Sequence, residues 1–177
     1  EINEEEIVLT NTQVNKLEIT SVSPEQRIYR KRWFKLEPFE NIQDDTAFIG
    51  NVFVHIIKSP TDSFRVTMLK LSNGRTTSTS SRLADMIRFN ATQKDSLLIV
   101  DQGFAINKKD KFRNQRIVLT VYVPVGKQVR VDKSVGWLRN VEFDGPWSTD
   151  WDINYGDLEH GWQTNETYVM KNEGLFT

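Results

Sequence analysis

The stretch RIVLTVYVPVGKQVRVD, residues 116–132, decides the fold. Its first half carries β-branched and aromatic residues whose apolar side chains fall on both faces of an extended chain. One face holds Ile117, Leu119, Val121 and Val123, and the other holds Val118, Thr120 and Tyr122. Because neither face is fully polar, this segment predicts a strand in the middle of a sheet.

Residues 124–127 interrupt this alternation. Pro124 has a fixed φ and no backbone donor, and Gly126 supplies the left-handed conformation that a tight reversal needs. A second alternating segment follows, with Val129 and Val131 on one face. We therefore expect Pro124 and Gly126 to form a structural turn between two strands of a hairpin, in which no residue is a catalytic group.

The composition narrows the class of protein. A chain of 177 residues is long enough for one domain with a real core, which we expect to span residues 1–177. The 23 Lys and Arg nearly balance the 24 Asp and Glu, so the net charge of the chain is close to zero. The absence of cysteine excludes disulfides and thiolate metal sites. No apolar run approaches the roughly 20 residues that span a bilayer. Because the chain opens at Glu1, we interpret it as an excised soluble part of a longer membrane protein.

Further strands are predicted before the opening stretch, from apolar runs at 7–10, 17–20, 48–58, 64–68 and 97–100. The acidic start, with Glu1, Glu4, Glu5 and Glu6, is expected to fray. His55 lies within the strand at 48–58 but has no second histidine at metal-ligand spacing. We therefore interpret His55 as a core or interface residue.

One short helix is predicted at 81–89, where Leu83, Met86 and Ile87 fall on one side. The preceding hydroxyl run at 76–81 lacks the glycines and lysine of a phosphate loop and the GxSxG turn, so we interpret it as the helix N-cap. The predicted fold class is therefore all-β with one short helix near 81–89 that closes an open end or face. Its short strands would stack as a β-solenoid or prism, or as a sandwich.

Residues 27–35, RIYRKRWFK, place cations around aromatic rings. Proteins that bind single-stranded nucleic acids use this combination, since cations track phosphates and rings stack on bases. A half-buried strand with cationic stems lying over apolar surface gives the same pattern. The balanced total charge favours the second interpretation, so we expect no nucleic-acid partner.

The segment from 137 to 162 contains four of the five tryptophans, beside several aspartates. Asp150 begins a segment like a calcium loop, but Gly156 stands one place late and Gly161 stands where a bidentate Glu belongs, so no metal is expected. The rings either pack on the β core as a clasp, which we favour, or form a stacking platform. The ligand or partner surface would then comprise Trp147, Asp150, Trp151, Asn154 and Trp162.

Several of these segments together resemble one family, the carboxy-terminal toast-rack domain of phage-shock protein C (PspC) relatives from Bacteroidota-like bacteria. The wider group includes the carboxy-terminal part of LiaF proteins. The similar residues are Leu98, Phe104, FRNQ at 112–115, the strand at 118–123 with PVGK at 124–127, and the closing stretch with Trp162, 168–170 and 174–175. The resemblance implies stacked β-strands downstream of a membrane-embedded region in an envelope stress system, and it carries no catalytic residues.

The resemblance favours a non-enzymatic sensor or interaction domain of a PspC-like envelope stress-response protein. It implies an inner-membrane anchor outside this chain, a periplasmic domain with the cytoplasmic face as the alternative, and a protein partner at the membrane or self-association. The other function considered is a carbohydrate- or cell-wall-glycan-binding β module that uses the Trp/Asp-rich segment. A hydrolase needs paired carboxylates or a Ser/His/Asp set, which no spacing here singles out. We expect no enzyme activity and no cofactor.

Overall fold

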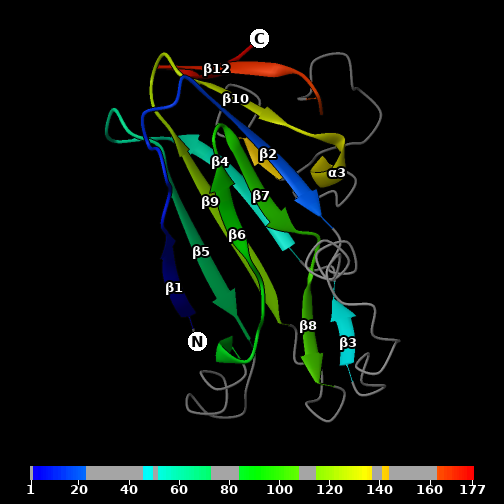
Figure 1. Ribbon diagram of the computed structural model, residues 1–177. Coiled ribbons are helices and arrows are strands. Elements are labelled where there is room, and N and C mark those ends of the chain that lie inside the picture. The colour runs from blue at the N-terminus through cyan, green and yellow to red at the C-terminus, as the bar shows by residue number, and fades with distance from the viewer. Residues whose placement is uncertain are drawn as a thin grey trace.

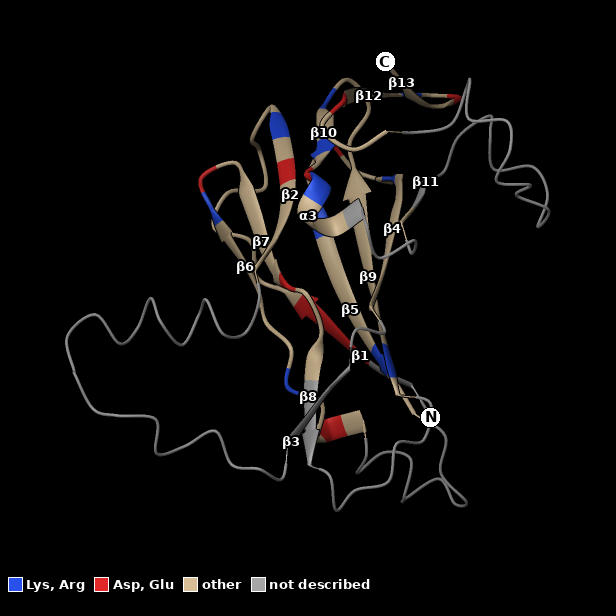
Figure 2. Ribbon diagram, turned by 90° about the vertical axis from the view of Figure 1, so that its right-hand side faces the viewer, with Lys and Arg blue, Asp and Glu red and all other residues tan. Residues whose placement is uncertain are grey.

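The computed structural model describes residues 2–22, 46–49, 52–72, 84–107, 115–136, 141–143 and 163–177. Their strands form two main mixed sheets, seen as two layers in Figure 2, and one two-stranded sheet. The all-β class predicted from the sequence is confirmed. In chain order the elements in Figure 1 are β1 Ile2–Ile7, β2 Lys16–Val22, β3 Thr46–Ile49, β4 Val52–Lys58, β5 Arg65–Leu71, β6 Ala91–Lys94, β7 Leu97–Asp101, β8 Phe104–Asn107, β9 Arg116–Val123, β10 Gln128–Val131, α3 Lys133–Gly136, β11 Val141–Phe143, β12 Thr167–Lys171 and β13 Gly174–Phe176.

One hydrophobic core joins the two main sheets. Successive side chains of a strand point to opposite faces, so alternate residues of each strand enter the space between the layers. One layer contributes residues of β4, β5 and β9, and the other contributes residues of β2, β7, β10 and β12. The two layers therefore stabilise each other by burying apolar surface on their facing sides.

The first half of the opening stretch is the central strand of the five-stranded sheet, whose order is β1-β5-β9-β4-β11. β9 pairs in parallel with β4 and antiparallel with β5. On its inner face all four apolar residues are 0% exposed, while on its other face Arg116 is exposed and the remaining residues are half-buried. The prediction of a central strand is confirmed.

The predicted turn at 124–127 is confirmed, but the predicted hairpin is wrong. Gly126 has a φ of 83°, and Lys127 N donates to Pro124 O at 3.1 Å. The chain does not return along β9. It crosses to the other layer, where β10 pairs with β2 and β12, and Gly126 N donates to Met170 O at 2.8 Å. Each strand has one buried face, and placing them in opposite layers lets both faces share one core.

The six-stranded sheet has the order β13-β12-β10-β2-β7-β6. β2 lies inside it, parallel to β10 on one side and to β7 on the other. Leu17 and Ile19 of β2 are 0% exposed, as is Leu98 of β7. The strands predicted at 17–20 and 97–100 are confirmed.

The start of the chain differs from the prediction. Instead of fraying before a strand at 7–10, it forms β1, which pairs antiparallel with β5 along Ile2–Ile7. Two cations of β5 offset the acidic charges, because Lys70 Nζ lies 3.4 Å from Glu5 Oε2 and Arg65 Nε lies 3.3 Å from Glu6 Oε1. Opposite charges across the two strands permit an acidic segment to extend the sheet.

The single strand predicted at 48–58 is divided in the structure. β3 ends at Ile49 and pairs antiparallel with β8, whereas β4 begins at Val52 and enters the five-stranded sheet. Within β4 the inner residues are buried and the alternate ones, including His55, are half-buried. The predicted placement of this strand in the middle of a sheet holds for β4, since β9 and β11 flank it.

The helix predicted at 81–89 ends earlier than expected, and residues 81–83 lie outside the described residues. Ala84 and Asp85 are helical, Met86 lies in a turn, and the chain leaves the helix from Ile87 onward. The chain then turns extended toward β6, and Asn90 N donates to the Asp101 carboxylate at 2.8 Å. Ile87 is buried as expected from its place on the apolar side, and Ala84 is also buried, but Met86 is 39% exposed.

α3 was not predicted from the sequence. Asp132 Oδ1 accepts a hydrogen bond from Ser134 N at 2.8 Å, which is an N-cap contact. The pKa of Asp132 is lowered, chiefly by a side-chain hydrogen bond with Ser134, and the backbone N–H of Ser134 lowers it further.

The basic-aromatic segment at 27–35 and the hydroxyl run at 76–81 lie outside the described residues. In the ranges that the structure does describe, none of the helices has the length and apolar character needed to cross a membrane.

Candidate binding groove

The residues predicted to form a ligand or partner surface all lie between 147 and 162, outside the described residues. The clasp and the stacking platform therefore both stay predictions for Trp147, Asp150, Trp151, Asn154 and Trp162. The described residues offer a different candidate, a shallow groove where β1 ends and the chain crosses to β2. It has a volume of about 350 Å³ and is lined by Glu6, Ile7, Val8, Leu9, Thr12, Phe64 and Arg65.

The base of this groove is apolar. Phe64, the residue before β5, is 1% exposed, and the half-buried Ile7 and Leu9 pack against the core. Val8 between them is 88% exposed. A valine side chain in water forgoes the roughly 1.5–3 kcal/mol that full burial would contribute. Single exposed apolar residues are common on protein surfaces, and what distinguishes Val8 is its place beside an apolar hollow.

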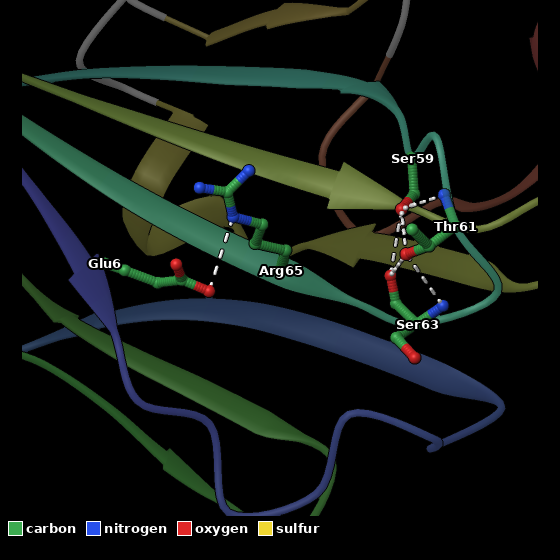
Figure 3. A network of polar contacts seen from close by, with 5 residues as sticks. All are labelled: Glu6, Ser59, Thr61, Ser63 and Arg65. Atoms are coloured by element: carbon green, nitrogen blue, oxygen red, sulfur yellow. Dashed lines mark hydrogen bonds and ion pairs between the residues drawn. The ribbon is translucent and has the colours of Figure 1, made fainter.

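The rim of the groove carries one pair of opposite charges. Figure 3 shows Glu6 of β1 reaching toward Arg65 of β5, with 3.3 Å between Glu6 Oε1 and Arg65 Nε. The Arg65 guanidinium also lies over the Tyr122 ring, 5.3 Å from its centroid. The side chains of Arg65 and Glu6 are 46% and 61% exposed, so solvent screens the pair and it contributes only about 0–1 kcal/mol. Both charged groups stay accessible to a ligand.

The loop that forms one wall is tied to both sheets. Phe64 N donates to Thr12 O at 2.9 Å, which fixes the loop to the start of β5. On the other side, Gln93 of β6 accepts from Thr10 Oγ1 at 3.2 Å and from Asn11 N at 2.9 Å. Its amide nitrogen donates to Asn11 O at 2.8 Å. These bonds connect the loop to both sheets, and the groove is present in the chain without a partner.

Gln93 is the important residue that the sequence did not reveal. It is 7% exposed, and its amide nitrogen also donates to Asp95 O at 2.9 Å. A buried amide with this many partners stabilises a loop because leaving those groups unpaired would cost free energy. No local pattern marks it, since its loop partners lie 82 and 83 residues away.

The turn beside the groove, between β4 and β5, is held by its own hydroxyl groups (Figure 3). Ser59 Oγ donates to Ser63 O at 2.9 Å, and it accepts from Thr61 N at 3.2 Å. Ser63 N in turn donates to Thr61 Oγ1 at 3.4 Å. Bonds of this kind are turn-forming contacts between side chain and backbone, and they position the start of β5.

The described residues also show where titratable groups lie relative to one another. In register, His55 of β4 is paired with Thr120 of β9 and Glu142 of β11. Within the described ranges, no group of three or more His, Cys, Asp or Glu residues could hold a metal ion. The groove itself offers apolar surface, a strand edge and one carboxylate-guanidinium pair, which are the means of binding rather than of bond cleavage.

Comparison with known proteins places the chain in a family. No curated protein matches the chain. The family described as ToastRack found in some PspC matches residues 39–176, which include every described strand except β1 and β2. This is the family that the sequence resembles, so the resemblance is confirmed. The chain belongs to the toast-rack domains found in some PspC proteins.

Proposed function

We propose that this chain is the non-enzymatic sensor and interaction domain of a PspC-like envelope stress-response protein. The family supports the PspC context. The single observation that carries the interaction role is Val8, which is 88% exposed beside an apolar groove whose wall is fixed by hydrogen bonds to both sheets. In this proposal the parent protein is anchored in the inner membrane, and this domain meets a protein partner on the periplasmic side.

A rigid groove with an exposed apolar residue suits recognition of a protein partner. A pre-formed surface loses little conformational entropy when the partner binds, which favours affinity. The neighbouring charged pair adds orientation rather than much binding free energy. Such a surface can report the presence or absence of a partner without any chemical step.

The test is a stress-response reporter in cells that express the full-length protein. Val8→Glu places a charge on the groove without removing a buried side chain, so we expect normal protein levels and loss of most of the stress induction. Glu173→Lys changes an exposed charge elsewhere, in the connection between β12 and β13, and should leave induction unchanged. Normal induction by Val8→Glu at normal protein level would contradict the proposal.

A further inference from the structure

The groove continues along the chain into the edge of a sheet. β1 is the end strand of the five-stranded sheet, and β5 is its only strand neighbour in the described part of the chain. At six residues it is longer than the other end strands, β6 with four and β11 and β13 with three each. The outer side of an edge strand presents backbone N–H and C=O groups with which another extended chain can pair.

The side chains of this edge give it a defined pattern. Glu4 and Glu6 lie two positions apart, in register with Leu69 and Thr67 of β5, and both are exposed. Val8 follows after the same interval, at the groove. A strand that pairs with this edge places every second one of its residues opposite Val8, Glu6 and Glu4, because side chains alternate along a strand.

Charge decides between the two occupants that an edge strand commonly accepts. A second copy of the chain would pair β1 with itself, because a two-fold contact uses the same patch on both subunits. Its acidic residues would then face acidic residues, and like charges directly opposite each other destabilise a strand pair. A partner segment with cationic residues at alternate positions instead places each cation opposite an acidic residue of β1, Glu4 or Glu6.

We propose that β1 and the groove dock an extended segment of a partner protein by strand addition. The segment carries one apolar residue that covers Val8 and enters the groove, followed at alternate positions by two basic residues opposite Glu6 and Glu4. The pattern, read along an antiparallel partner strand, is apolar-x-basic-x-basic. This inference rests on the proposed interaction role and names the chemistry of the partner for that same site.

The probe is a fluorescein-labelled peptide, Gly-Thr-Leu-Thr-Lys-Thr-Lys-Thr-Gly, titrated with the full chain at low salt. Its comparison peptide has Glu in place of both Lys. We expect at least tenfold tighter binding of the Lys peptide, and reversal of that preference in the double variant Glu4→Lys with Glu6→Lys. Because Glu6 contacts Arg65, Glu4→Lys alone is the milder variant and should reduce the preference severalfold. A matched control, Glu166→Lys with Glu173→Lys, changes the net charge equally at exposed sites near β12 and should keep the preference for the Lys peptide.

Hydrogen exchange with the peptide bound is the second measurement, since strand addition slows exchange of the backbone amides in residues 2–8. Equal affinity for the two peptides, or unaltered preference in the Glu4 variants, would overturn the proposal. Binding without slowed exchange at 2–8 would overturn strand addition, and a dimer in solution that pairs through β1 would assign the edge to a second copy instead. If Val8→Glu abolishes stress induction while no peptide binds, the proposed interaction role is kept and docking by strand addition at β1 is rejected.

Discussion

β1 and β2 both lie within residues 2–22, before the region that matches the family, yet they differ in their position in the sheet and in burial. β2 is inserted between β10 and β7, and its Leu17 and Ile19 are 0% exposed. β1 lies at the end of its sheet with Glu4, Glu5 and Glu6 exposed. A segment outside the family match can therefore supply the middle of a sheet as well as a surface for a partner.

The largest difference between the two strands should appear when one side chain of each is shortened. Leu17→Ala leaves a cavity in the core and should lower the free energy of unfolding by about 2–5 kcal/mol. Glu4→Ala, on the exposed edge, should change it by about 0.5 kcal/mol or less. Urea denaturation followed by circular dichroism measures both, and equal losses in the two variants would remove the distinction.

The connection between β1 and β2 should depend on Gln93. Gln93→Ala removes the partner of the part-buried backbone N–H and C=O of Asn11, and we expect a loss of about 1–3 kcal/mol in the free energy of unfolding. Thr92→Ala, at the exposed neighbouring position, is the matched control and should have little effect. Chemical denaturation decides, and a Gln93→Ala variant as stable as Thr92→Ala would show that the loop does not rely on this residue.

The turn at Gly126 leads the chain from β9 in one layer to β10, which pairs with β2 in the other layer. Gly126→Val should cost about 1 kcal/mol or more, since a side chain at a φ of 83° is strained even though its Cβ would meet no atom within 4 Å. Gly126→Asn should recover part of that loss, because asparagine tolerates this conformation. Thermal melting of the two variants is the measurement, and a Val variant that melts with the parent would contradict the assigned turn.

The smallest effect concerns Asp132, which follows β10 and caps α3 beside β2. The folded state lowers its pKa from the usual 3.8, chiefly through the side-chain hydrogen bond with Ser134, so this carboxylate stabilises the fold above its unfolded pKa. That contribution disappears as the pH falls through the lower folded pKa. The stability difference between the parent and Asp132→Asn should therefore shrink from pH 6 toward roughly pH 3. A difference that stays constant over this range would contradict the assigned cap.

The sequence predicted those features that depend on neighbours in the chain. The alternation of Ile117 to Val123 identified β9 as a central strand, and Pro124 with Gly126 identified the turn. What it did not predict depends on distant partners. The acidic start forms a strand because Arg65 and Lys70 offset its charge, and Gln93 holds a loop 82 residues away.

The same limit explains the candidate site. The groove exists only because a loop crosses from one sheet to the other beside Phe64, and no residue type in 6–12 marks it. The partner of β10 was also missed, because alternation shows that one face is buried but not in which layer the strand lies. The tryptophan-rich surface at 147–162 lies outside the described residues and stays a prediction.

The most direct measurement is hydrogen exchange of the backbone amides in the unliganded full chain. It tests whether β2 is structural and β1 is an accessible edge. We predict that the amides of Lys16–Val22 exchange as slowly as those of Arg116–Val123, through unfolding of the whole domain. The amides of Ile2–Ile7 should exchange far faster, through local opening of the edge. Rapid exchange in β2, or protection of β1 equal to that of β2, would contradict the account.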